Sequence, residues 1–259
     1  MLSDYLYTFK DLNVFFNLFN YISFRAGISL VTSLFIVVII MPYWIRLQYK
    51  MFPSGQPIRE DGPSTHLSKK GTPTLGGVLI IISIILSTLL WTSEFSKYNY
   101  ILILSLILFG IIGFYDDFQK VKIKKGISSK KKFILQIFFT IIIYFTIRLN
   151  GFDLNNFFIP FLKNVSVELG FFYFFLFLFI IIGSTNATNL TYGLYGLVSM
   201  PLIFVFLTFT VFAYILGNIN FSNYLLINYM PGSGEIVIFC TSAIGAILGF
   251  LWFNSSPAS

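Results

Sequence analysis

The chain has 259 residues, of which 56% are hydrophobic and only 10% are charged, and its formal net charge is +7. About a quarter of the residues in a soluble domain are charged, so this composition excludes an ordinary soluble enzyme. The mean hydropathy of +0.83 predicts an all-α, polytopic membrane protein with a single transmembrane domain over residues 1–259. Cys240 is the sole cysteine and cannot form a disulfide within the chain.

Residues 1–26 lack the pattern of a cleavable signal, because Asp4 and Asp11 occupy the region that would be basic. Apolar and polar side chains alternate there, which favours an amphipathic segment at the membrane interface. Seven later segments are apolar and long enough to cross about 30 Å of hydrocarbon. They are approximately 27–47, 74–91, 100–115, 133–148, 171–183, 199–217 and 235–253.

The basic residues predict the orientation of these spans. Lysine and arginine are concentrated after the first and third spans, and this excess is typical of cytoplasmic loops. We therefore expect cytoplasmic loops at about 48–73, 116–132 and 184–198. Basic loops also suit nucleic acid, but in a lipid-embedded chain they favour anionic lipid or a phosphorylated substrate.

The first of these loops is rich in glycine, proline and hydroxyl side chains and contains Lys69 and Thr74. Its backbone amides and lysines are suited to cradling a phosphate. A purely structural interpretation stays open, in which Pro73 begins a helix and Gly76 and Gly77 allow close helix packing. His66, the sole histidine, is not assigned as a base.

The second loop begins with two adjacent carboxylates, Asp116 and Asp117, and continues with seven lysines. Charges at the edge of hydrocarbon are expensive and are usually retained for function, although a solvated helix end is the simpler interpretation. Neighbours on a helix point about 100° apart, so we expect the two carboxylates to have different roles. Lys120 and Lys124 would share a face if the helix continues, and the lysines can also serve only as topological anchors.

The third segment, 183–197, packs polar side chains between two apolar spans, where unsatisfied polar groups cost several kcal/mol each. Asn189, Tyr192 and Tyr195 recur at a spacing of three residues and would share a helical face.

These polar stretches resemble one family, the phospho-N-acetylmuramoyl-pentapeptide transferases, within the wider group of polyprenyl-phosphate N-acetylhexosamine-1-phosphate transferases. The stretches that carry the resemblance are 56–67, 71–77, 113–120, 185–191 and 245–254. They occur in the family's order and extend over nearly the whole chain, whereas chance similarity between membrane proteins would match apolar residues.

The resemblance implies transfer of phospho-N-acetylmuramoyl-pentapeptide from UDP to undecaprenyl phosphate, which gives lipid I and UMP in peptidoglycan synthesis. It also implies Mg²⁺ as cofactor, a site on the cytoplasmic face of the bacterial inner membrane, and a homodimer. Asp116 and Asp117 match the family's catalytic aspartates, and either is a candidate metal ligand. The matching substrate-binding positions are Lys69, Thr74, Lys120, Lys124, Lys132, Asn189 and Asn254.

The chain departs from the family pattern in two ways. Tyr192 and Tyr195 stand where the family has site aspartates, and a phenol with a pKa near 10 is mostly neutral at pH 7. The family also continues beyond Ser259 into a segment with its main metal-binding aspartate and three more spans. We therefore expect a C-terminally truncated member with little activity alone.

Two other classes of function compete with this interpretation. A non-catalytic or decayed homologue would bind only nucleotide or polyprenyl phosphate. A channel or transporter would place ionisable groups near the bilayer midplane, but no acidic residue lies at the centre of a predicted span, and Glu235 lies at the edge of the last.

Overall fold

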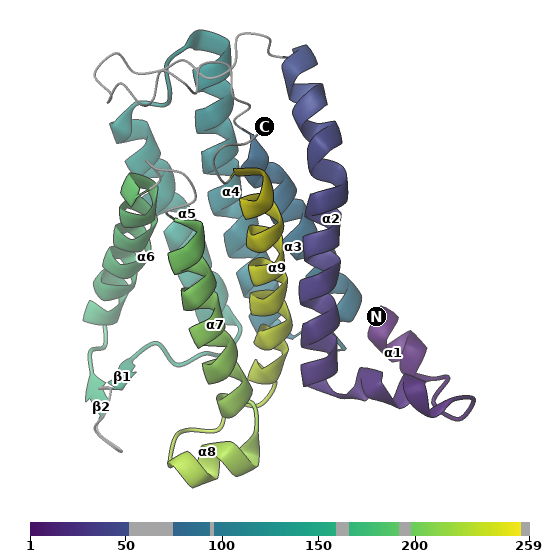
Figure 1. Ribbon diagram of the computed structural model, residues 1–259. Helices are drawn as coiled ribbons and strands as arrows, with labels where there is room; N and C mark the ends of the chain where they lie inside the picture. The colour runs from purple at the N-terminus through teal and green to yellow at the C-terminus, as the bar shows by residue number, and fades with distance from the viewer. Residues whose placement is uncertain (52–74, 94–95, 159–165, 192–197, 255–259) are drawn as a thin grey trace.

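The computed structural model describes residues 1–51, 75–93, 96–158, 166–191 and 198–254. Within these residues, seven long helices run up and down in one bundle (Figure 1). They are α2 (Ile22–Met51), α3 (Gly76–Trp91), α4 (Lys97–Ile123), α5 (Ser129–Leu149), α6 (Phe172–Thr191), α7 (Ser199–Leu216) and α9 (Ile236–Asn254).

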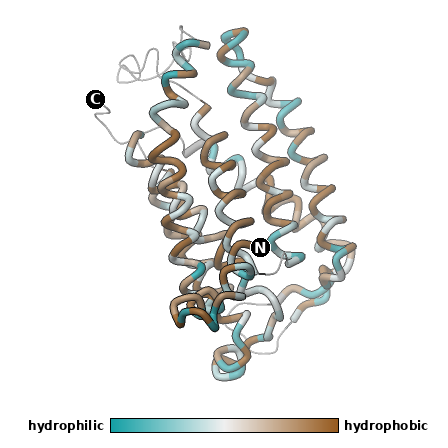
Figure 2. Tube along the Cα trace, turned by 90° about the vertical axis from the view of Figure 1, so that its right-hand side faces the viewer, coloured by the Kyte–Doolittle hydropathy of each residue, from teal (hydrophilic) through white to brown (hydrophobic). Residues whose placement is uncertain are grey.

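The helices confirm the prediction of an all-α, polytopic membrane bundle. Six of them are long and apolar enough to cross a membrane, and α3 is a shorter apolar helix of 16 residues. Hydrophobic residues dominate the middle of the helices, while hydrophilic residues are more frequent toward the ends (Figure 2). Seven apolar helices therefore correspond to the seven predicted spans.

The smaller elements lie between or before the long helices. Residues 1–26 were predicted to form an interfacial segment. Their first 20 residues contain α1 (Leu2–Tyr7) and the 3₁₀ helix η1 (Val14–Asn20), whereas residues 22–26 are already the start of α2. The position of α1 and η1 at a membrane interface stays a prediction. Strands β1 (Asn156–Phe158) and β2 (Ser166–Glu168) pair antiparallel, with Phe157 opposite Val167. The other short elements are α8 (Ile219–Leu225) and the 3₁₀ helix η3 (Ser233–Glu235).

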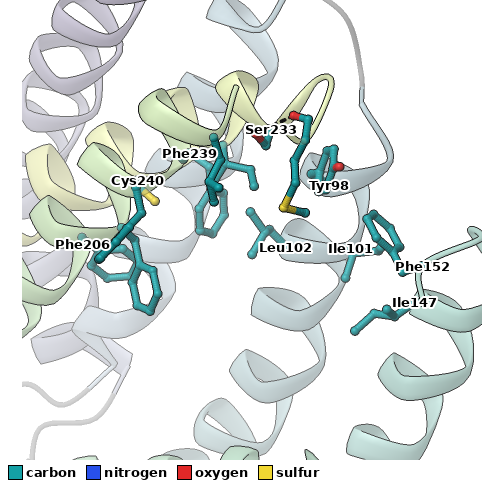
Figure 3. A pocket seen from close by; sticks show the side chains of 15 residues that line it. Tyr98, Ile101, Leu102, Ile147, Phe152, Phe206, Ser233, Phe239 and Cys240 are labelled. Atoms are coloured by element: carbon teal, nitrogen blue, oxygen red, sulfur yellow. Dashed lines mark hydrogen bonds between the residues drawn. The ribbon is translucent and has the colours of Figure 1, made fainter. Parts of the chain in front are cut away.

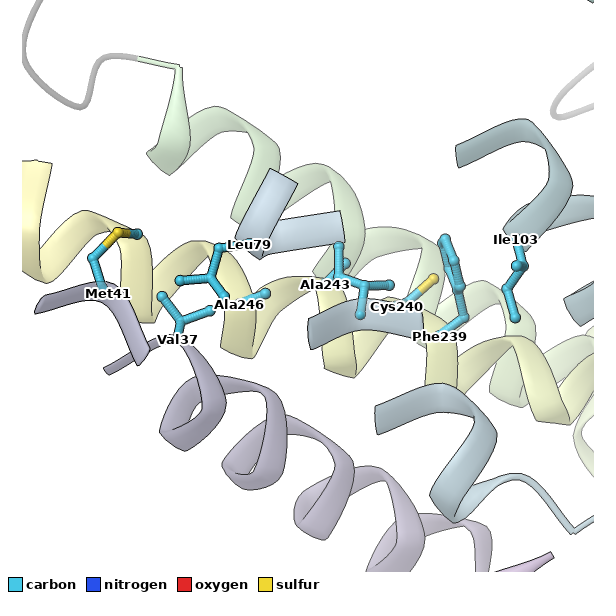
Figure 4. Close-up of a cluster of buried hydrophobic side chains, with 9 residues drawn as sticks. Val37, Met41, Leu79, Ile103, Phe239, Cys240, Ala243 and Ala246 are labelled. Atoms are coloured by element: carbon cyan, nitrogen blue, oxygen red, sulfur yellow. The ribbon is translucent and has the colours of Figure 1, made fainter. Parts of the chain in front are cut away.

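Helix α9 is the centre of the bundle. It contacts α2, α3, α4 and α7, and two thirds of its span is buried, whereas none of the span in α6 is. Phe239, Cys240, Ala243 and Ala246 of α9 form the core together with side chains of α2, α3 and α4 (Figure 4). The helices at the edge of the bundle therefore present mostly exposed apolar side chains, which suits contact with lipid.

Two glycines let α2 approach α9 closely. A side chain at Gly245 would collide with the carbonyl oxygen of Leu30 and the hydroxyl of Ser33, and a Cβ at Gly249 would lie 2.9 Å from Val37 Cβ. Small residues spaced four apart are a common device for close packing of membrane helices.

Serine and threonine hydroxyls add hydrogen bonds between the central helices. Ser87 Oγ of α3 donates to the Ser29 carbonyl of α2 over 2.7 Å, and Ser29 Oγ donates to the Ile238 carbonyl of α9 over 3.0 Å. Such bonds are worth about 1 kcal/mol each between membrane helices, so they fix the helices relative to one another more than they drive folding.

A buried ion pair joins the first long helix, α2, to the 3₁₀ helix η3, which directly precedes α9, at one end of the bundle. The guanidinium of Arg25 in α2 donates to both carboxylate oxygens of Glu235, over 3.0 and 2.8 Å. Ser93 donates its N–H and its hydroxyl to the same carboxylate, over 3.2 and 3.0 Å. Since only 3% of Arg25 and 8% of Glu235 are exposed, this pair is a structural element of the bundle.

Candidate functional site

The last turns of α4 contain both aspartates and a lysine that binds them. Lys120 Nζ lies 2.8 Å from Asp116 Oδ2 and 3.0 Å from Asp117 Oδ1. The apolar run ends near residue 115, but the helix continues to Ile123. Residues 116–123, predicted to begin a loop, are therefore helical, and this explains how one lysine reaches carboxylates three and four residues earlier.

The segment between α4 and α5 folds back onto Asp116. Asp116 Oδ1 accepts a hydrogen bond of 2.9 Å from the N–H of Ile127. A Cβ at Gly126 would lie 2.7 Å from this same oxygen and 3.2 Å from Lys120 Cε. Glycine at this position therefore lets the backbone come close enough to hold the carboxylate.

The two carboxylates have different surroundings, as their adjacent helical positions predict. Only 12% of the Asp116 side chain is exposed, against 35% of the Asp117 side chain. Asp116 is bound by Lys120 and by the loop backbone, so it is not a solvated residue at a helix end. Asp117 is therefore the more accessible of the two carboxylates.

Two lysines near the pair occupy special positions. Lys124 has a left-handed backbone with φ of 57° and forms the C-cap of α4, so the helix does not continue and Lys124 does not extend the face of Lys120. Lys132 lies in the first turns of α5, which Ser128 caps by accepting the N–H of Lys131 over 3.4 Å. Burial alone would raise the pKa of Asp116, but Lys120, the N–H of Ile127 and, to the smallest extent, the charge of Lys132 hold it below its usual value.

The other predicted binding residues are only partly described. Asn189 lies exposed in α6, and Asn254 is the last residue of α9 and half-buried. The ends of α4, α6 and α9 and the start of α5 all lie in the upper half of the bundle in Figure 1, so these residues share one end of the molecule. Lys69, Thr74, Tyr192, Tyr195 and the expected loop around His66 lie outside the described residues.

Sequence reasoning missed two residues, one against the carboxylate pair and one between α5 and α6. Gly126 follows a run of lysines, and its position against Asp116 depends on the fold of the whole loop. Gln136 is a lone amide within the apolar span of α5, only 1% exposed, and it pairs with Asn186 of α6. An isolated amide in a membrane span was the available signal, because such a group needs a partner.

The two carboxylates of the cluster would supply only part of the coordination of a Mg²⁺ ion. Mg²⁺ commonly takes one or two protein carboxylates and fills its remaining positions with water and phosphate oxygens. Lys120 contacts both carboxylates, but Asp117 is more exposed and suits such a role better than Asp116, which also accepts the N–H of Ile127. The described part of the chain has no group of three carboxylate, histidine or cysteine side chains that would bind a metal without a phosphate ligand.

An apolar cavity of about 470 Å³ lies away from this cluster, between α4, α5, α7 and α9. Its wall includes Tyr98 at the start of α4, Phe152 after α5, and Cys240 and Phe239 of α9 (Figure 3). The lining is hydrocarbon with a few hydroxyl and thiol groups, so the cavity is not suited to binding a diphosphate.

Comparison with known proteins matches this constellation to one family. The family model of glycosyl transferase family 4 matches residues 99–259. The phospho-N-acetylmuramoyl-pentapeptide-transferase of Rickettsia prowazekii (strain Madrid E) is 43% identical over 247 residues, which are 93% of this chain and 68% of the relative. Proteins of the same name from Rickettsia felis and Desulfotalea psychrophila are each 44% identical, over 93% and 94% of this chain and 68% of each relative.

The matched region contains the carboxylate pair, Lys120, the α4–α5 loop and the polar end of α6, so the similarity includes the candidate site as well as the apolar spans. Because a relative is 43% identical over 93% of this chain, the chain belongs to glycosyl transferase family 4 and, within it, to the phospho-N-acetylmuramoyl-pentapeptide-transferases.

Proposed function

We propose that this protein transfers phospho-N-acetylmuramoyl-pentapeptide from UDP to undecaprenyl phosphate, which forms lipid I and releases UMP. The observation that carries the proposal is the cluster of Asp116, Asp117 and Lys120 at one end of a membrane bundle. One substrate is soluble and the other is embedded in lipid, and both are anionic. A site at the membrane boundary with carboxylates and lysines is suited to bringing them together.

The reaction exchanges one phosphoryl bond for another. An oxygen of the lipid phosphate attacks the sugar-linked phosphorus of the UDP-sugar, the bond to the bridging oxygen breaks, and UMP leaves with that oxygen. The residues contribute mainly orientation and charge stabilisation. We assign Asp117 to contact with the reacting phosphates, directly or through a metal, and Asp116 to holding Lys120 and the loop.

Lysine charges offset the negative charge of the diphosphate. Lys120 is held between the two aspartates, Lys132 acts on the same cluster, and Lys124 projects from the end of α4. We further propose Mg²⁺ as cofactor, with Asp117 as one ligand; when bound, it neutralises developing charge on the diphosphate. Lys69, Thr74, Asn189 and Asn254 remain proposed contacts for the substrates.

The location follows from the same reasoning. A UDP-sugar is a cytosolic substrate, so we place the end of the bundle with the aspartates on the cytoplasmic face of the bacterial inner membrane. The lysines of the α4–α5 loop support this orientation. A homodimer in the membrane is part of the proposal and is tested by the size of the purified protein.

The test measures UMP release by purified protein in detergent with UDP-N-acetylmuramoyl-pentapeptide, undecaprenyl phosphate and magnesium. We expect slow release, because tyrosines replace two site aspartates, and this release should require both substrates. It should fall at least about hundredfold in Asp117→Asn, as expected for loss of a preorganised charged group. Tyr192→Asp with Tyr195→Asp should raise the rate, because the two phenols are neutral at pH 7 where the family has carboxylates.

Calorimetry with the UDP-sugar distinguishes this activity from the alternative of a binding protein. Binding without UMP release, in the chain and in the double aspartate variant, would support a non-catalytic homologue. A folded protein that neither binds the nucleotide sugar nor releases UMP would refute both functions.

A further inference from the structure

A reciprocal pair of amides lies between α5 and α6. Gln136 Nε2 donates to Asn186 Oδ1 over 3.3 Å, and Asn186 Nδ2 donates to Gln136 Oε1 over 3.0 Å. Asn186 Nδ2 also contacts the Ile182 carbonyl within α6 at 3.0 Å, and Thr140 Oγ1 donates to the main-chain carbonyl of Gln136. Each side chain therefore finds its partner on the facing helix although both helices are membrane spans.

Helices α5 and α6 are in contact even apart from this amide pair. Helix α6 already contacts α5 through aromatic rings, with Tyr144 packed 5.0 Å from Phe174 and 5.6 Å from Phe177. None of the span in α6 is buried, so apolar contacts alone leave the rotation of α6 weakly determined. Gln136 is buried and Asn186 is half-buried. A polar pair of this kind fixes register and rotation, because an amide is costly to leave unpaired between membrane helices.

The position of the pair connects two parts of the candidate site. Gln136 lies in α5, which begins two residues after Ile127, whose N–H donates to Asp116 Oδ1 over 2.9 Å. Asn186 lies three residues before Asn189 on α6, so both are on one side of that helix. The rotation that Gln136 imposes on α6 therefore sets where Asn189 lies relative to the carboxylates.

We propose that Gln136 is a positioning residue for the transferase site: through Asn186 it fixes the rotation of α6 and so holds the asparagine side of α6 toward the phosphosugar nucleotide. This inference rests on the proposed function and adds to it a residue of α5 that touches no substrate. The pair determines which face of α6 is turned toward α5. Its loss should therefore weaken binding of the UDP-sugar more than it lowers the stability of the bundle.

The first experiment measures geometry and needs no activity. Spin labels are attached to Leu47→Cys on α2 and Thr188→Cys on α6, both exposed positions, in a Cys240→Ala background, and the distance distribution between them is recorded. Gln136→Leu should shift or broaden the distribution. The exchange of the two amides, Gln136→Asn with Asn186→Gln, should restore the original one, because the summed length of the two side chains is unchanged.

The second experiment measures KM for the UDP-sugar and its affinity by calorimetry. Gln136→Leu should raise KM and the dissociation constant about tenfold each, with a smaller change in kcat, and the exchanged pair should recover most of the lost affinity. Tyr144→Leu, which removes aromatic contact at the same helix interface, is the matched control and should lower thermal stability without this selective change in KM.

The outcomes separate the two proposals. An unchanged distance distribution in Gln136→Leu overturns the positioning role, whatever the turnover. Equal effects of Gln136→Leu and Tyr144→Leu on stability and KM also overturn it, since the amide pair would then be only a structural contact. A shifted distribution in a protein without UMP release or nucleotide binding supports the control of α6 by Gln136 and refutes the proposed function instead.

Discussion

The buried ion pair between Arg25 and Glu235 gives a sharp prediction about stability. Glu235→Gln keeps the shape of the side chain but removes its charge, so the guanidinium of Arg25 stays buried without a counter-ion. Glu235 accepts four hydrogen bonds, two from Arg25 and two from Ser93. Removing one partner of a buried pair costs about 3–5 kcal/mol, and we expect Glu235→Gln to lower the free energy of unfolding by this amount.

The measurement can use the protein's own cysteine. Cys240 is 3% exposed in the core formed by α9, so a thiol-reactive dye labels it only when the bundle opens. Unfolding in mixed detergent micelles with increasing denaturing detergent is then followed by the rate or extent of labelling. Each variant should have the helix content of the original protein before denaturing detergent is added, so that labelling of Cys240 reports unfolding from the same folded state.

Two further variants separate the charge from the hydrogen bonds. Ser93→Ala removes one neutral donor to Glu235 and should cost only about 1 kcal/mol. Arg25→Met with Glu235→Leu removes both charges and should cost less than Glu235→Gln, because paired burial carries its own desolvation penalty. Arg25 Nε has no partner among the described residues, so the pair is not fully satisfied and the double replacement should be tolerated better still.

The reasoning about the ion pair would be refuted if Glu235→Gln lost less than about 1 kcal/mol, the value of an exposed salt bridge. It would also be refuted if the double variant were the least stable of the set. In that case packing of the two long side chains, and not compensation of charge, would hold this end of the bundle together.

Two glycine positions give matched comparisons of the site and the core. Gly126→Ala in the α4–α5 loop should slow UMP release about tenfold or more, because the added Cβ would displace Asp116 Oδ1. Gly113→Ala in α4 places its Cβ in open space and should leave the rate unchanged. Equal rates in the two variants would contradict the role of Gly126. Gly245→Ala should destabilise the bundle by about 1–3 kcal/mol through overpacking against α2, as measured by labelling of Cys240. Gly77→Ala, with no atom within 4 Å of its Cβ, should be neutral or slightly stabilising, and a similar loss in both would show that close approach at Gly245 is unimportant.

The sequence predicted the helices better than their contacts. Continuous apolar runs located all seven long helices, since hydrocarbon thickness sets the length of a span. The ends of α4 and α6 were misjudged, because polar side chains interrupt both apolar runs; α6 was expected to end at residue 183 but continues to Thr191. Lys120, four residues after Asp116, could have indicated that the helix continues, because oppositely charged residues at this spacing support a helix.

Contacts between distant segments were beyond sequence reasoning. Glu235 was recognised only as a charge at the edge of a span, and its partner Arg25 lies 210 residues away. Gln136 and Asn186 are 50 residues apart, and each could have paired with any polar group in the membrane. Hydropathy likewise did not distinguish α9, the central helix, from α7, because both are apolar throughout and only packing determines which one is buried.

The two adjacent aspartates differ in their hydrogen-bond partners and in their exposure. A helix turns by about 100° per residue, so one carboxylate faces the α4–α5 loop while its neighbour stays about one third exposed. Lys120 is placed three and four residues later and reaches both, which neutralises one of the two negative charges. Asp117 is the more exposed of the two, so it is the member that we propose contacts a metal or a phosphate. A pair of adjacent carboxylates on a continuous helix therefore differs from a chelating pair, because its two members point in different directions and have different partners.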